Sequence, residues 1–260
     1  MIHDTAIIDS NAKIGKNVEI GPFCIIGPNV KIGDNNKLQS NVVLTGNTTV
    51  DEGNIFYPFS SIGNDPQDLK YKGENTELII GKNNKIREYV TIHPGTIGGG
   101  GKTIIGSNNL LMISVHIAHD CILGNNIVLA NNVAVAGHAE ISDNVIIGGN
   151  SGVQQFTRIG KMAMVGGMTG VDSDVIPYGL CIGNRNILQG LNLVGLRRKN
   201  IPNKDIIELG KVYDEIFKSK QIRDNLSKLN GSFENNPLVK DLIDFLNKDK
   251  KRPICSPFNK

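Results

Sequence analysis

Residues 2–44 read IHDTAI IDSNAK IGKNVE IGPFCI IGPNVK IGDNNK LQSNVV L, with an aliphatic residue at every sixth position. The spacing continues as far as Val171, with breaks after Ile62 and Ile92, and gives 26 repeats. A period of six fits neither the 3.6-residue period of a helix nor the two-residue alternation of a hairpin strand. Hexapeptide repeats are the sequence signature of a parallel β-helix. We therefore predict a mainly β fold in which three hexads form each coil of 18 residues.

Two other positions of the hexad support this fold. Four residues after the aliphatic residue comes a small or β-branched one, as at Val18, Cys24 and Thr48, which suits a second inward position in a narrow prism. Three residues after the aliphatic residue, Asn predominates, and Asn adopts the left-handed backbone region more readily than other non-glycine residues. We predict left-handed corners at Asn11, Asn17, Asn29, Asn35, Asn41, Asn47, Asn83, Asn108, Asn126, Asn132, Asn144 and Asn150.

Two segments interrupt the repeats, and we predict that both leave the coil as loops. Residues 63–78 contain a polar run with Pro66. Residues 94–103 contain four consecutive glycines and shift the register by one residue. Loops that leave a rigid scaffold are common sites of binding chemistry.

The last part of the chain has a different pattern. The hexads end at Pro177, and residues 204–229 have helical spacing. Asn236 and Pro237 suit the N-cap and first turn of a further helix. We predict a parallel β-helix over residues 1–186 and a C-terminal α-helical domain over residues 187–260, which would cover the open end of the coil.

The net charge of +3 is unevenly distributed. Residues 187–260 have 15 Lys and Arg against 9 Asp and Glu, whereas residues 1–186 have 13 against 16. A basic tail suits an acidic protein or phosphate groups, and it also suits a solvated helical surface. We expect no nucleic acid partner.

The cysteines and the apolar runs indicate where the protein acts. The N-terminal residues lack an export signal, and the chain contains no run of 18 apolar residues, so we expect no stable membrane insertion. Scattered cysteines fit neither a zinc motif nor a disulfide framework and favour reduced thiols in a cytoplasmic protein. These cysteines are Cys24, Cys121, Cys181 and Cys255.

Histidines supply the candidate chemistry, and three of the five lie within 23 residues. An offset of 18 residues stacks His119 with Gly137 and Asp120 with His138. A histidine is a suitable general base near neutral pH, a carboxylate can orient its ring, and a glycine above it leaves space for a substrate and a backbone N–H for an oxyanion. The alternative is that these are polar corner residues that bond only to their neighbours.

A zinc site is a second alternative, because histidines on stacked coils can bind a metal. Two residues separate His116 from His119. In the zinc-binding hexapeptide carbonic anhydrases, four residues separate the corresponding pair of histidines, and a third histidine lies further away in the sequence. We predict no metal.

Several motifs resemble one family along essentially the whole chain. The sequences PQDLKY at 66–71, HIAHDC at 116–121 and AGH at 136–138 are similar to those of the acyl-carrier-protein–UDP-N-acetylglucosamine O-acyltransferases. Further similar segments are 86–88, 91–93, 129–132 and 190–192. The left hand of the coil is taken from this resemblance, since the spacing alone does not set it.

The resemblance implies an acyltransferase that moves a 3-hydroxyacyl chain from acyl carrier protein to the 3-hydroxyl of UDP-N-acetylglucosamine, the first step of lipid A biosynthesis. It implies a homotrimer with active sites between neighbouring subunits, and no cofactor, because phosphopantetheine arrives on the acyl carrier protein. The implied catalytic residues are His119, Asp120 and Gly137. The implied substrate-binding residues are Gln67, Asp68, Lys70, His93, His116, His138, Gln154, Gly167, Asn192, Arg198 and Lys199.

The chain departs from the family at two positions. Gln154 stands where a histidine is common, which we expect to alter donor handling, and Val194 stands where an acidic residue often contacts the ribose. The pair Gly166 and Gly167 resembles the place where family members limit the acyl chain with a glycine or a bulkier residue, and glycine there implies an open groove, so we expect a long acyl chain. Two alternatives stay open: transfer to a 3-amino sugar nucleotide, and an acetyl-CoA-dependent hexapeptide acetyltransferase, although the latter gives no reason for the QDLK loop.

Overall fold

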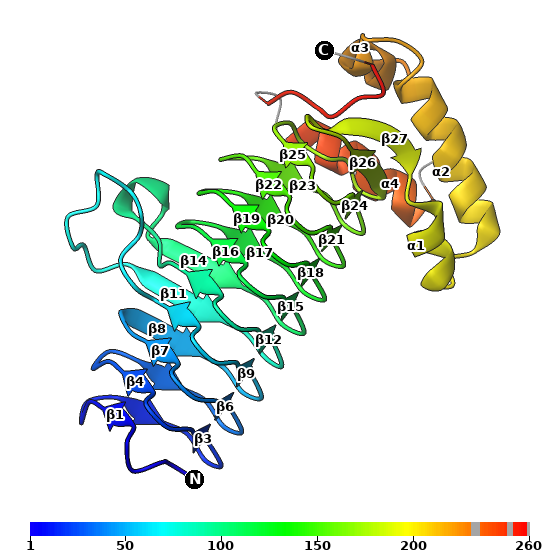
Figure 1. Ribbon diagram of the computed structural model, residues 1–260. Helices are drawn as coiled ribbons and strands as arrows, with labels where there is room; N and C mark the ends of the chain where they lie inside the picture. Colours follow the sequence, from blue (N-terminus) through cyan, green and yellow to red (C-terminus); the bar gives the residue numbers. More distant parts are fainter. Residues whose placement is uncertain (230–234, 249–251, 259–260) are drawn as a thin grey trace.

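The computed structural model describes residues 1–229, 235–248 and 252–258. The chain forms a left-handed parallel β-helix, and its helices gather at the C-terminal end of the coil (Figure 1). The mainly β prediction and the C-terminal helices are confirmed.

Three sheets form the sides of the coil in the described part of the chain, and their strands are parallel except for β27 at the end of the third sheet. The first sheet contains β1 (Ile7–Ile8), β4 (Ile25–Ile26), β7 (Val43–Leu44), β10 (Ser61–Ile62), β13 (Thr91–Ile92), β16 (His116–Ile117), β19 (Ala134–Val135), β22 (Gly152–Val153) and β25 (Gly170–Val171). The second contains β2 (Lys13–Ile14), β5 (Lys31–Ile32), β8 (Asn47–Val50), β11 (Glu77–Ile80), β14 (Lys102–Ile105), β17 (Ile122–Leu123), β20 (Glu140–Ile141) and β23 (Arg158–Ile159). The third contains β3 (Glu19–Ile20), β6 (Lys37–Leu38), β9 (Ile55–Phe56), β12 (Lys85–Ile86), β15 (Leu110–Leu111), β18 (Val128–Leu129), β21 (Ile146–Ile147), β24 (Met164–Val165), β26 (Gly179–Ile182) and β27 (Ile187–Leu191).

The strand register follows the predicted repeat. Ile117 pairs with Val135, which pairs with Val153, so corresponding residues of successive coils lie 18 positions apart. Ile117 and Val135 are fully buried, as the hexad predicts. Because the residue before each buried aliphatic points outward, the same register decides which side chains can line a surface groove.

The predicted corners are confirmed at nine of the twelve asparagines, which have φ between 55° and 61°. The prediction is wrong for Asn11, Asn29 and Asn47, which do not have positive φ. The Asn11 N–H donates to the Asp9 carboxylate instead, and Asn47 begins the extended strand β8.

A second set of asparagines, which the sequence pattern did not distinguish, forms a ladder inside the coil. The backbone N–H of Asn54 donates to the Asn36 side-chain oxygen, and that of Asn84 donates to the Asn54 oxygen, both at 2.8 Å. The Asn84 oxygen in turn accepts the N–H of Asn109 at 2.9 Å. These side chains satisfy corner N–H groups that would otherwise be buried without acceptors.

The two loops are shorter than predicted. Glu77 and Leu78 already belong to β11, and Lys102 and Thr103 belong to β14. The four-residue strands β8, β11 and β14 pair along their full length, which draws these residues back into the sheet. The second loop contains a short 3-10 helix, η1 (Ile97–Gly99), and Figure 1 shows both loops projecting on the same side.

The C-terminal part contains α1 (Leu193–Arg198), α2 (Asn203–Ile216), α3 (Ile222–Ser227) and α4 (Pro237–Lys248). The helical pattern over 204–229 therefore belongs to two helices. They separate because the buried Asn225 side chain of α3 donates to the carbonyl of Ile216 at the end of α2. The Asn236 cap is confirmed, since its side-chain oxygen accepts the N–H of Leu238. No helix in the described ranges has both the length and the apolar character needed to cross a bilayer.

The boundary at residue 187 stays a prediction, although the chain there is not yet helical. Ile187 begins β27, which pairs antiparallel with β26. The helices are attached to the coil through Arg158, whose guanidinium bonds to the buried Asp174 carboxylate and to the Phe245 carbonyl of α4. The same guanidinium lies 4.4 Å from the centre of the Phe245 ring.

The asparagine ladder gives a test of the fold. Asn84→Ala leaves the Asn109 N–H without its acceptor and the Gly106 carbonyl without the Asn84 side-chain donor, and we expect a loss of about 3 kcal/mol in the free energy of unfolding. Urea denaturation measures this change. Asn29→Ala, an exposed asparagine outside the ladder, is the control and is expected to change stability by less than about 0.5 kcal/mol. Equal stability of the two variants would contradict a structural role for the ladder.

Candidate active site

A groove of about 440 Å³ lies along the first sheet beside its corner. Small side chains line much of it, because the outward positions of β19 and β22 are Ala134 and Gly152. The polar residues of the lining are Gln67, His116, His119, Gln154 and Gln155. The register therefore gathers polar groups around a groove lined by small apolar residues.

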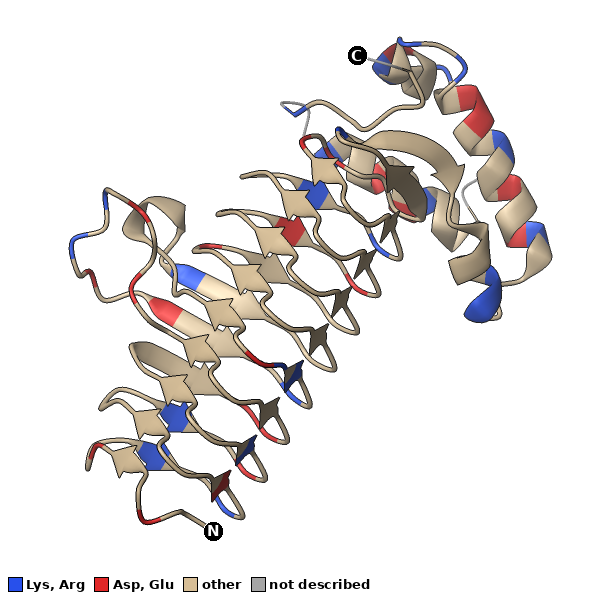
Figure 2. Ribbon diagram, viewed as in Figure 1, with Lys and Arg blue, Asp and Glu red and all other residues tan. Residues whose placement is uncertain are grey.

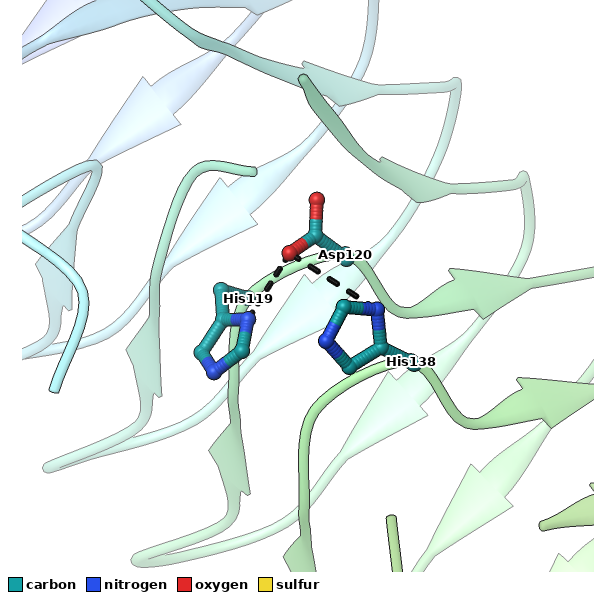
Figure 3. Close-up of side chains that lie close together, drawn as sticks. All are labelled: His119, Asp120 and His138. Atoms are coloured by element: carbon teal, nitrogen blue, oxygen red, sulfur yellow. Dashed lines mark hydrogen bonds and ion pairs between the residues drawn. The ribbon is translucent and has the colours of Figure 1, made fainter. Parts of the chain in front are cut away.

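His119 and Asp120 form a hydrogen-bonded pair at this groove (Figure 3). His119 Nδ1 lies 2.8 Å from Asp120 Oδ2, and the Asp120 side chain is completely buried. An ionised carboxylate only accepts hydrogen bonds, so Nδ1 carries the proton and Nε2 keeps its lone pair. Nε2 has no hydrogen-bond partner among the described residues and belongs to a side chain that lines the groove.

Asp120 is isolated from other charged residues along the sequence. Between Thr103 and Ala139, Asp120 is the one Asp, Glu, Lys or Arg residue in the sequence. Figure 2 shows this middle part of the coil as almost uniformly uncharged. Asp120 raises the pKa of His138 and so offsets part of the effect of burial there, and Asp68 of the first loop acts on His138 in the same direction.

The predicted stacking of His119 with Gly137 is confirmed. The His138 N–H donates to the His119 carbonyl at 3.0 Å, which fixes one coil on the next. A Cβ atom on Gly137 would lie only 2.6 Å from the His119 ring. Only glycine at position 137 leaves the imidazole in place, and the Gly137 N–H has no acceptor within the described ranges.

His138 lies on the other side of Asp120, with its Nδ1 3.9 Å from Oδ2. Its ring stacks on Phe156 at 4.3 Å and meets the His119 ring edge-on at 5.1 Å. Asp120, His138 and Phe156 occupy left-handed corners with φ of 60°, 61° and 62°. Such positions usually favour Asn or Gly, although Phe59, Tyr89 and other residues adopt the same backbone elsewhere in the coil.

His93 and His116 form a second pair, with ring centres 5.0 Å apart. His116 Nδ1 lies 2.8 Å from the Thr91 hydroxyl. Burial, together with the neighbouring His116 and His119, lowers the pKa of His93 to about 4. Burial also lowers the pKa of His116 and that of His138, the latter effect being partly offset by Asp120. These imidazoles are therefore neutral near pH 7.

The remaining predicted site residues lie outside the groove lining. Asp68 and Lys70 belong to the first loop, where the Lys70 N–H donates to the Asp68 carboxylate. Gly167 lies beside Gly149, at the corner before β25. Asn192 caps α1, while Arg198 and Lys199 lie exposed at its end. In Figure 1, α1 and the first loop project from opposite sides of the coil.

The sequence pattern did not identify Thr96 and Thr103 as part of the site. The Thr96 N–H and hydroxyl both donate to the Asp120 carboxylate, at 2.8 and 2.6 Å. The Thr103 hydroxyl oxygen accepts the Asp120 N–H at 2.8 Å. The one signal in the sequence was the off-register, glycine-rich interruption at 94–103.

His119, Asp120 and His138 offer ligand atoms within 4.8 Å of one another and are the group among the described residues that could hold a metal ion. His116 is not in this group. Both Asp120 oxygens already accept hydrogen bonds from Thr96 or His119, so a metal would have to displace these donors. The geometry thus suits proton transfer better than metal binding.

A hexapeptide coil with a carboxylate-bound histidine beside a groove is the arrangement that the comparisons with known proteins have to explain, and they indicate a hexapeptide-repeat transferase. The model described as bacterial transferase hexapeptide (six repeats) matches residues 1–33 and 102–137. The model described as UDP N-acetylglucosamine O-acyltransferase, domain 2, matches residues 174–255.

Individual relatives make the family specific. The acyl-[acyl-carrier-protein]–UDP-N-acetylglucosamine O-acyltransferases of Rickettsia felis and Rickettsia rickettsii are 54% and 57% identical, covering 98% of this chain and 97% of their own length. The UDP-N-acetylglucosamine O-acyltransferase from Moraxella catarrhalis, whose crystal structure is known, is 47% identical in sequence to this chain. Its structure matches with a TM-score of 0.94 over 98% of this chain and 99% of that one. The chain therefore belongs to the acyl-[acyl-carrier-protein]–UDP-N-acetylglucosamine O-acyltransferase family and is an acyltransferase.

The depressed pKa of His93 predicts a pH-dependent stability. An unfolded histidine binds a proton near pH 6.5, whereas folded His93 binds it only near pH 4. The contribution of His93 to the free energy of unfolding is therefore fully present above pH 6.5 and is lost as the pH falls towards 4. Between pH 7 and 4.5 we expect the wild type to lose about 2 kcal/mol more than His93→Gln in urea denaturation. Parallel losses in the two proteins would contradict this assignment.

Proposed function

We propose that this enzyme transfers a 3-hydroxyacyl chain from acyl carrier protein to the 3-hydroxyl of UDP-N-acetylglucosamine, with His119 as the general base. Nε2 of His119 removes the hydroxyl proton while the sugar oxygen attacks the thioester carbonyl. The tetrahedral intermediate then expels the thiolate, and the imidazolium returns its proton to that sulfur. The Gly137 N–H stabilises the oxyanion, and Asp120 stabilises the imidazolium.

The observation that carries this proposal is the His119–Asp120 pair. The carboxylate fixes the proton on Nδ1, so the basic Nε2 is available to the groove. Gly137 is stacked on the His119 ring. This places a backbone N–H, the donor that an oxyanion needs, beside the proposed base.

The groove suits the two substrates. Gln67, His116 and Gln154 supply polar groups for the sugar nucleotide and the donor, while the Ala and Gly surface suits an acyl chain. We assign Asp68 and Lys70 to sugar binding from the adjacent loop, and His93 and His138 to positioning around His116 and His119. Gly167 would border the far end of the acyl chain.

We further propose a homotrimer. Asn192, Arg198 and Lys199 lie on the other side of the coil from the loop of the same chain, so a neighbouring copy would have to supply them to the groove. Exposed apolar side chains, including the stacked pair Phe59 and Tyr89, mark a surface that a second copy can cover.

The donor explains two further features. An acidic carrier protein suits the basic tail, and a thioester is already activated, so the transfer needs no cofactor. Four buried free cysteines are compatible with a reducing cytoplasm, where we place the enzyme and the first step of lipid A biosynthesis.

The central assay follows acyl transfer from 3-hydroxyacyl carrier protein to UDP-N-acetylglucosamine. We expect His119→Ala to lower kcat by about 10²–10⁴-fold because the general base is removed. His3→Ala, an exposed histidine at the N-terminal end, is the control and should retain wild-type activity. Activity of His119→Ala within a few-fold of wild type would exclude His119 as the base.

The same assay distinguishes the alternative substrates. We expect the 3-hydroxyl acceptor and the acyl carrier protein donor to be preferred over the 3-amino acceptor and over acetyl-CoA. Faster transfer to the amino analogue would make the product an amide, and faster use of acetyl-CoA would make the enzyme an acetyltransferase.

A further inference from the structure

The loop formed by residues 94–103 encloses the Asp120 carboxylate. Thr96 donates its backbone N–H to Oδ1 at 2.8 Å and its hydroxyl to Oδ2 at 2.6 Å. Oδ2 is also the oxygen that holds His119 Nδ1. The Thr96 hydroxyl and the His119 imidazole therefore share one acceptor, and a completely buried carboxylate has three donors.

The loop itself is held at both ends by the second sheet. The Gly95 N–H donates to the Glu77 carbonyl, and the Glu77 N–H donates to the Gly101 carbonyl. The Thr96 carbonyl accepts the N–H groups of Gly99 and Gly101, which closes the turn on itself. Thr96 is thus fixed by the backbone before it contacts Asp120.

The loop also packs tightly on the carboxylate. A Cβ atom on Gly99 would lie 2.0 Å from Asp120 Cγ. Asp120 already has a left-handed backbone with φ of 60°, which sets the direction of its side chain. Thr96 then fixes the remaining rotation of the carboxylate about its own axis, because one oxygen faces the N–H and the other faces the hydroxyl.

We propose that Thr96 is a positioning residue for acyl transfer, acting through Asp120 on the His119 imidazole. This inference rests on the proposed function, in which His119 is the base. Thr96 does not line the groove, so it orients the base without touching either substrate. The glycine-rich loop at residues 94–103 thus places Thr96 of one coil against the Asp120 carboxylate of the next coil.

The test compares Thr96→Val, which removes the hydroxyl, with Thr96→Ser, which keeps it. For Thr96→Val we expect kcat to fall about 10–100-fold, since a misplaced base costs that much, with KM for both substrates within about two-fold of wild type. Thr96→Ser is expected to restore kcat to within about three-fold of wild type, because its hydroxyl can still donate to Oδ2.

Thr169→Val is the matched control. Thr169 is a buried threonine in a later coil of the same β-helix, directly before β25, and its hydroxyl has no partner in the described residues, so its loss should change neither kcat nor KM. Circular dichroism and thermal unfolding of all variants establish that the fold is retained. If Thr96→Val does not fold, Thr96→Ala removes the same hydroxyl with less crowding and replaces it in the comparison.

Wild-type kcat in Thr96→Val, equal impairment of the Val and Ser variants, or a change confined to KM would each overturn the inference. His119→Ala is assayed in parallel. If His119→Ala is inactive while Thr96→Val is normal, this inference alone fails. If His119→Ala is active, the proposed function fails first.

Discussion

Backbone hydrogen bonds between successive coils are the interaction on which the rest of the structure depends. Each bond, such as that from the His116 N–H to the Val133 carbonyl, sets residues one coil apart on the same face of the prism. A slip of one residue would exchange inward and outward side chains along a whole face. The candidate site therefore needs no special strand or helix, since stacking alone places Gly137 over His119 and His138 over Asp120.

The corners show how the site differs from its scaffold. Half of the described non-glycine residues with a left-handed backbone are Asn, which tolerates that backbone, and an inner asparagine ladder binds N–H groups at the corners. At the groove, Asp120 and His138 adopt the same backbone although neither is glycine or asparagine. Their less favourable conformation is maintained by the inter-coil hydrogen bonds and by Thr96, which is a common arrangement at functional sites.

The sequence predicted the features that repeat and missed those that occur once. A period of six and an 18-residue offset suffice to stack His119 on Gly137, because every coil obeys the same register. The contact of Thr96 with Asp120 spans 24 residues through an off-register loop, so no periodicity reveals it. Likewise, the break between α2 and α3 depends on one buried Asn225 contact, and no residue of α1 belongs to the lining of the groove.

The central claim is that the His119 ring, stacked with Gly137 and bonded to Asp120 through Nδ1, performs the proton transfer through Nε2. The variant Gly137→Ala tests this claim most directly. The added Cβ would lie 2.6 Å from the ring, so the imidazole must move while the coil remains folded. Gly210→Ala, where the space is open, is the matched control. We predict that Gly137→Ala loses at least about 100-fold in kcat while Gly210→Ala keeps wild-type turnover. A folded Gly137→Ala enzyme with wild-type kcat would contradict the account.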